Sequence, residues 1–381
     1  MSIRTSRLFF VDHLRVALTI LVVLHHVAMV YGASAPFYYA EPPFTDPLAF
    51  RAFLIFALLN QAWFMGAFFL FAGYFAPGSY DRKGAGEFLT SRILRLGIPI
   101  LLFYFVLSPI SSIGYYLMPP ELTGITTSPT FQAYPGLVGL GPLWFVAMLL
   151  AFNIGYAAWR MLTQKWAPAT REASRPNILA VGAFILLLAG ASYLMRQVVP
   201  IGESVLDFPT LAYLPQYLGF FVVGIVAARR DWFRTLPGWM GAAGFVMAII
   251  AAIVLFPLAF SGRWFSLELT PALDNAMGNG HWQSAVYALF DSLFAVGLCL
   301  GLIPIFRSLF NRESRVGRFL SRHSYAVYIF HIPIVVFLAY ALRGIVLSPL
   351  LKFGLVSLIV VPICFVVAAV VRKVPFAAQA L

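Results

Sequence analysis

Ten apolar stretches, each about as long as a membrane-spanning helix, alternate with short polar connections along the chain. A helix needs about 20 apolar residues to cross the hydrocarbon core of a bilayer. The connections are rich in proline, glycine and charge, as in "APGSYDRKGAGE" and "RRDWFRTLPG". The pattern predicts an all-α polytopic integral membrane protein with about ten transmembrane helices. The predicted spans are 9–31, 50–76, 92–118, 141–162, 177–195, 210–228, 238–260, 283–306, 324–343 and 351–371.

The composition excludes a soluble protein. Hydrophobic residues make up 61% of the 381 residues and charged residues 10%, and the mean hydropathy is +0.87. The net charge of +12 lies in the short connections. The tendency of Lys and Arg to stay on the cytoplasmic side explains this charge, so we expect no nucleic-acid partner. Cys299 and Cys364 fall inside apolar stretches without a metal-ligand spacing, and we expect neither a disulfide framework nor a metal site.

The distribution of Lys and Arg predicts the orientation. If the N-terminus is cytoplasmic, 21 of the 26 Lys and Arg residues lie at cytoplasmic ends or connections. This bias predicts that both termini are cytoplasmic, in a multi-pass protein of the cell inner (plasma) membrane. There is no internal repeat, and the last span ends near the end of the sequence. We therefore expect a single ten-helix domain over residues 1–381 with no appended soluble domain.

The first span carries ionisable residues that are costly in a bilayer. An Arg or Asp at the centre of a membrane helix costs roughly 2.5–3.5 kcal/mol, so such residues are candidates for function. Arg15 and His26 are eleven residues apart, which places them on one helix face about 16 Å apart, and Asp12 lies near that face. The stripe suggests the lining of a polar tunnel. The alternatives are that Asp12 and Arg15 reach the headgroups, and that His26 is a neutral histidine bonded to a neighbouring helix.

Two further ionisable residues lie in later spans. Asp291, in "YALFDSLFAVG", is near the predicted depth of His26 and can orient or charge-pair an imidazole, or pair with a polar neighbour on another helix. His331, in "SYAVYIFHIPIV", has either a functional role or a structural hydrogen bond.

Several segments resemble the acyltransferase family 3 membrane proteins. "VDHLRVALTILVVLHH" is similar to their first helix, in which Asp is followed three residues later by Arg and after ten more residues by a catalytic His. Four further segments match in order: "FFLFAGYFAP", "SRILRLGIPIL", "GPLWFVAMLL" and "HSYAVYIFHIPIV". The resemblance runs from about residue 8 to 340. It implies that His26, Arg15 and Asp12 are catalytic, that His331, Tyr74 and Trp144 support them, and that Arg92 and Arg95 bind the donor. Asp291, singled out by its depth, is a further candidate for a supporting residue.

The chain departs from the family pattern in two places. Ala72 replaces the usual Ser before Gly-Tyr, so this position offers no hydroxyl. "LWFVAMLL" replaces a Trp-Ser-Leu-x-x-Glu segment and lacks its glutamate. These departures favour the branch similar to periplasmic-glucan succinyl-modifying and exopolysaccharide O-acetylating proteins.

The resemblance implies O-acyl transfer. We expect an acetyl or succinyl group to pass from cytoplasmic acyl-CoA to a hydroxyl of a cell-envelope carbohydrate or glycolipid, with membrane lipids around the protein. Acyl-CoA is then a donor substrate, and no cofactor is bound permanently. His26 acts either as the base or as an acylated intermediate. The alternative class is a proton-coupled transporter or flippase, which would not cleave a thioester.

Overall fold

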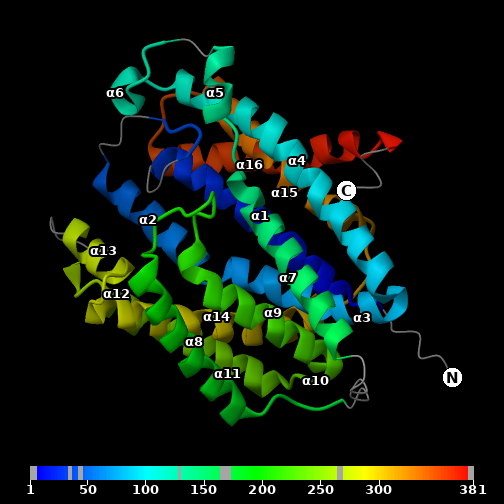
Figure 1. Ribbon diagram of the computed structural model, residues 1–381. Helices are drawn as coiled ribbons and strands as arrows, with labels where there is room; N and C mark the ends of the chain where they lie inside the picture. The colour runs from blue at the N-terminus through cyan, green and yellow to red at the C-terminus, as the bar shows by residue number, and fades with distance from the viewer. Residues whose placement is uncertain are drawn as a thin grey trace.

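The structure is a bundle of helices. The computed structural model describes residues 7–32, 37–41, 46–127, 130–163, 173–263 and 269–375 (Figure 1). Among these residues, the only β-type pairing is an isolated antiparallel bridge between Val205 and Phe208. Nine helical runs in the same part of the chain are long and apolar enough to cross a membrane. The chain is therefore an all-α polytopic membrane protein, as the sequence predicts.

The helices follow one another along the chain, joined by connections of different lengths. Their bounds are α1 (Phe9–Gly32), α2 (Pro47–Gln61), α3 (Phe64–Arg92), α4 (Ile98–Leu102), α5 (Ser108–Leu117), α6 (Pro120–Thr123), α7 (Trp144–Leu162), α8 (Ile178–Val198), α9 (Leu214–Arg229), α10 (Trp232–Thr235), α11 (Gly238–Ile250), α12 (Phe256–Ala259), α13 (Leu269–Met277), α14 (Trp282–Leu309), α15 (Arg315–Ala341) and α16 (Pro349–Val371). Short π-helical turns at Ile93–Gly97, Phe103–Leu107 and Ala251–Leu255 continue helices. Each precedes a proline by two residues, and proline widens the preceding turn because it has no N–H and clashes with the carbonyl four residues earlier.

Eight of the nine runs coincide with single predicted spans. The ninth, Pro47–Leu117, has 71 residues and contains the two predicted spans 50–76 and 92–118. A straight helix of that length would measure about 100 Å, more than three times the thickness of the hydrocarbon core. The run bends at Gly84, whose φ of 74° and ψ of 173° are accessible to glycine and hardly to other residues. In Figure 1, α3 descends to the lower right and α4 and α5 run back upwards, so this run makes two passes.

Helices α1 and α15 form the centre of the bundle. They pack against each other, and α1 also packs against α2 and α16. In each of these two helices, 56% of the most apolar stretch of 18 residues is buried, compared with 22% in α8. Polar side chains on α1 and α15 are therefore held away from lipid, where they can line a site.

The start of α15 differs from the sequence prediction. The predicted span begins at residue 324, whereas α15 begins at Arg315. Ser314 caps the helix, since its hydroxyl accepts a hydrogen bond from the backbone N–H of Gly317 at 2.9 Å. Hydropathy alone misses this first part because it is basic, with Arg315, Arg318 and Arg322.

Glycines allow α3 and α9 to cross closely beside the site. A Cβ atom on Gly73 would lie 2.1 Å from the carbonyl oxygen of Phe221, and one on Gly224 would lie 2.2 Å from the carbonyl oxygen of Leu70. Small residues permit such approaches between membrane helices. The crossing fixes the part of α3 that carries Ala72 and Tyr74.

Charged residues gather at two ends of the bundle. We call one the basic end, where Arg82, Arg92, Arg95 and Arg234 line one cavity. At the far end the Lys352 ammonium bonds to the Glu41 carboxylate and donates to the Arg343 carbonyl oxygen at 3.1 Å. The cytoplasmic location of the basic end stays a prediction. The sequence analysis assigns the arginines of the basic end to one side of the membrane and Arg343 and Lys352 to the other. Their places at opposite ends of the bundle agree with ten passes.

Candidate active site

A cavity of about 920 Å³ opens at the basic end. Within the described residues its lining holds seven basic side chains and one carboxylate, that of Asp12. The basic side chains are those of Arg7, Arg15, Arg82, Lys83, Arg92, Arg95 and Arg234. Because low-dielectric walls focus the field of such a cluster, the cavity attracts anions.

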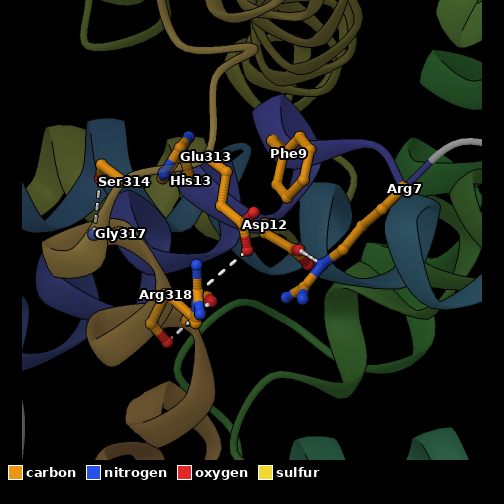
Figure 2. Close-up of a pocket in the computed structure, with 9 residues that line it drawn as sticks. Arg7, Phe9, Asp12, His13, Glu313, Ser314, Gly317 and Arg318 are labelled. Carbon is orange, nitrogen blue, oxygen red and sulfur yellow. Dashed lines mark hydrogen bonds and ion pairs between the residues drawn. The ribbon is translucent and has the colours of Figure 1, made fainter.

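Asp12 lies where α1 begins, next to α15. Its carboxylate accepts a hydrogen bond from Arg7 Nε at 2.8 Å, and its side chain is 19% exposed. Figure 2 shows this pair beside a second ion pair, in which Arg318 Nε lies 3.0 Å from Glu313 Oε1. The shallow position agrees with the alternative that Asp12 reaches the headgroup region. Its charge is offset locally by Arg7, so the cavity keeps a large positive excess.

Helix α1 carries one stripe of polar residues from the cavity towards His26. Asp12, Arg15 and Thr19 all line the cavity, at the spacing of one helix face. His26 lies seven residues beyond Thr19, which is two turns and about 10 Å further on the same face. The helix is unbroken over this distance. The shared face of Arg15 and His26 that the sequence predicts is therefore present, although His26 itself lies beyond the lining of the cavity.

The inner part of the cavity is aromatic. Its lining there includes Phe68, Phe145 and Tyr328, and the Tyr328 hydroxyl bonds to the carbonyl oxygen of Pro142. Nearer the basic end, the guanidinium of Arg95 lies 5.8 Å from the ring centroid of Tyr325. The cluster of Phe68, Phe145 and Tyr328 lies towards His331, because the Tyr328 ring contacts both phenylalanines and has its centroid 5.9 Å from that of His331. This arrangement suits a ligand with an anionic head and a neutral tail.

Just beyond the aromatic part, two histidines meet. His26 Nδ1 lies 3.0 Å from Nε2 of His331 on α15 and 2.9 Å from the carbonyl oxygen of Val22. His331 Nδ1 lies 2.8 Å from the carbonyl oxygen of Tyr328, and His331 is completely buried. The ring of His26 is also stacked against that of Phe37, with ring centroids 5.5 Å apart.

The sequence left open that His26 bonds to a neighbouring helix, as it does here, but it did not identify His331 as the partner. Both helices begin at the basic end, and His26 lies 17 residues after Phe9 while His331 lies 16 residues after Arg315. Both rings are therefore about 25 Å along their helices from that end. The predicted start of α15 at residue 324 placed His331 at too shallow a depth. His25 points elsewhere, with its ring centroid 5.3 Å from that of Phe64.

Asp291 is not the partner of His26. Its carboxylate pairs with Arg196, and both side chains are buried. The Arg196 guanidinium lies 5.0 Å from the ring centroid of Tyr213 and 5.3 Å from that of Tyr287. Of the alternatives that the sequence leaves open for Asp291, pairing with a polar neighbour on another helix holds, and orienting the imidazole of His26 does not. A buried carboxylate requires a nearby counter-charge, and Arg196 supplies it.

The other candidate residues divide between the cavity and the packed core. Arg92, Arg95 and Tyr74 line the cavity, and so does Ala72. The Tyr74 hydroxyl donates to Asp231 at 3.3 Å. Trp144 lies outside the lining, where it stacks on Tyr217 with ring centroids 5.4 Å apart. The described residues contain no cluster of His, Cys, Asp and Glu that could hold a metal ion.

Fold and site together define a multi-pass membrane protein in which a cationic cavity leads towards a buried imidazole. The sequence model of an acyltransferase domain matches residues 8–369. The chain therefore belongs to acyltransferase family 3 and is a membrane acyltransferase.

Related proteins agree with this assignment. Glucans biosynthesis protein C from Salmonella gallinarum, Salmonella paratyphi A and Salmonella typhimurium is 21% identical to this chain over 401, 398 and 401 residues. Each comparison covers 98% of this chain and 94% of the relative. No solved structure matches the chain significantly.

Proposed function

We propose that this protein transfers an acetyl or succinyl group from cytoplasmic acyl-CoA to a hydroxyl of a cell-envelope carbohydrate, in the inner membrane. The observation that carries the proposal is a single face of α1. Arg15 on this face lines the cavity with its seven basic side chains, and His26, paired with His331, lies further along the same face. The relatives are named for glucan biosynthesis, which makes a glucan the first acceptor to test.

The cavity suits the donor. The nucleotide end of coenzyme A carries a 3′-phosphate and a diphosphate, which the basic side chains at the mouth can bind. Arg15 suits a phosphate group because its planar guanidinium donates two parallel hydrogen bonds to two of the phosphate oxygens. The pantetheine arm is largely neutral and extended, and the aromatic inner part matches it. The distance of about 16 Å from Arg15 to His26 is within the reach of that arm.

His26 then performs the chemistry. Its imidazole removes the proton from the acceptor hydroxyl, and the oxygen attacks the thioester carbonyl carbon. The tetrahedral intermediate collapses, the carbon–sulfur bond breaks, and the acyl group stays on the acceptor oxygen. The proton held by His26 passes to the leaving thiolate, which restores the neutral imidazole and releases free coenzyme A.

The test is acyl transfer by purified protein in lipid nanodiscs. Acetyl-CoA and succinyl-CoA are supplied separately with a glucan acceptor, and thioester cleavage and acylated glucan are measured per folded protein. We expect His26→Ala to lose on the order of 10²–10⁴ in rate, the contribution of one acid–base group. Arg15→Lys should also fail, since an ammonium does not replace the bidentate fork.

His25→Ala is the matched control, because it removes the adjacent imidazole that faces Phe64. It should stay within a few-fold of the parent. Equal losses for His25→Ala and His26→Ala would indicate a packing defect, and full activity of His26→Ala would refute the mechanism. A transporter or flippase would leave the thioester intact in every variant.

A further inference from the structure

The contacts of the two histidines restrict where their protons lie. A carbonyl oxygen accepts hydrogen bonds and cannot donate them. His331 Nδ1, 2.8 Å from the Tyr328 carbonyl oxygen, must therefore carry a proton. His26 Nδ1, 2.9 Å from the Val22 carbonyl oxygen, must carry one for the same reason. With both rings neutral, each Nε2 is left with a lone pair.

The contact between the rings agrees with this assignment. His26 Nδ1 and His331 Nε2 are 3.0 Å apart, and one proton must lie between them. The proton on His26 Nδ1 fills this position and is shared between His331 Nε2 and the Val22 carbonyl oxygen. The reverse arrangement, with the proton on His331 Nε2, would turn bare His26 Nδ1 towards the lone pairs of the Val22 oxygen. It would also strip His331 Nδ1 of its proton unless that ring were cationic.

We propose that His331 is a positioning residue that accepts a hydrogen bond from His26 Nδ1–H and so leaves Nε2 of His26 as the nitrogen that takes the substrate proton. The inference rests on the proposed function, since it assigns the atom through which His26 acts. When His26 Nε2 takes the proton from the acceptor hydroxyl, the ring becomes a cation with both nitrogens protonated. His331 Nε2, still an acceptor, then binds a charged donor, and such hydrogen bonds are stronger than neutral ones.

The surroundings hold this arrangement in place. His331 is completely buried on α15, where its Nδ1 is anchored by the backbone of the same helix. Phe37 lies against the ring of His26, with a 26° angle between the ring planes. His26 is thus limited in rotation by one aromatic ring and two hydrogen-bond acceptors.

The first measurement is the protonation of each nitrogen. Nitrogen-15 NMR of the full-length protein, with all six histidines labelled, distinguishes a protonated ring nitrogen from a bare one. The His26 signals are assigned by their loss in His26→Ala, and the spectrum is taken at a pH where the rings are neutral. We expect a protonated Nδ1 and a bare Nε2 on His26. The opposite tautomer would overturn the proposal, and this experiment needs no variant of His331.

The second measurement compares His331→Gln with His331→Met. The two side chains have similar volume, but the glutamine carbonyl can replace Nε2 as an acceptor and the methionine cannot do so effectively. We expect kcat to fall about 10- to 100-fold in His331→Met, in keeping with the loss of one hydrogen bond to a charged group. The KM for acetyl-CoA should be unchanged, and His331→Gln should recover most of kcat.

The outcomes separate this inference from the proposed function. Equal losses in the two His331 variants, or a change in KM alone, would mean that His331 only fills space. A His331→Met protein as active as the parent, beside an inactive His26→Ala, would overturn the role of His331 and leave the proposed function intact. An active His26→Ala would overturn both.

Discussion

Replacing Asp291 with asparagine leaves the guanidinium of Arg196 buried without its counter-ion. Arg196 is 0% exposed and Asp291 is 1% exposed, so water cannot take the place of the lost carboxylate. Removing one partner of a buried ion pair costs about 3–5 kcal/mol of folding free energy. The surrounding rings of Tyr213 and Tyr287 offer only cation–π contacts in return. We therefore expect Asp291→Asn to be strongly destabilised, while the acyl transfer of its folded fraction stays within a few-fold of the parent.

The assay is thermal unfolding of the detergent-solubilised protein, in which size-exclusion chromatography measures the fraction that stays folded. Acyl transfer per folded protein is measured beside it. A double variant, Arg196→Met with Asp291→Leu, removes both charges and should be more stable than Asp291→Asn, since apolar replacement of a buried pair is often neutral. Asp274→Asn is the control, because this carboxylate is exposed on α13 and its loss should change stability by less than about 0.5 kcal/mol. An Asp291→Asn protein that folds like the parent but transfers no acyl group would refute the reasoning and give Asp291 a chemical role.

Two further predictions concern orientation and the departure at Ala72. Reporter fusions near residues 230 and 315 should report cytoplasm and those near 125 and 200 the outside, because Lys and Arg are retained on the cytoplasmic side; one inversion among well-expressed fusions would contradict this. Ala72→Ser should keep acyl transfer within a few-fold of the parent, since the added hydroxyl faces a polar cavity. A large gain in product per inserted protein would show that the hydroxyl has a role.

The spans could be predicted because a membrane helix is specified by local hydropathy. The stripe of Arg15 and His26 could be predicted for a similar reason, since helical spacing within one span fixes which residues share a face. The start of α15 was missed because a capping serine and basic residues extend the helix beyond its apolar part. A hydropathy pattern does not reveal such an extension.

The partners of the buried residues required the tertiary structure. Asp291 and His26 lie at similar predicted depths, and depth alone does not reveal which helices are neighbours. The contact of α1 with α15 brings His331 to His26, and the contact of α8 with α14 brings Arg196 to Asp291. Arg196 also shows that a basic residue counted for orientation can be buried once its charge is paired.

The position of the Phe37 ring bears on whether protons can pass through the bundle. A cavity that leads towards a pair of imidazoles within membrane-spanning helices resembles one half of a proton wire, because an imidazole nitrogen can take up or release a proton. Phe37 is 7% exposed and lies against His26 on the side of the chain segment that follows α1. An aromatic ring offers no lone pair or acidic proton to continue the relay. We therefore expect Phe37 to interrupt a proton path at His26, so that an ionisable side chain can lie inside the helix bundle without carrying protons across the membrane.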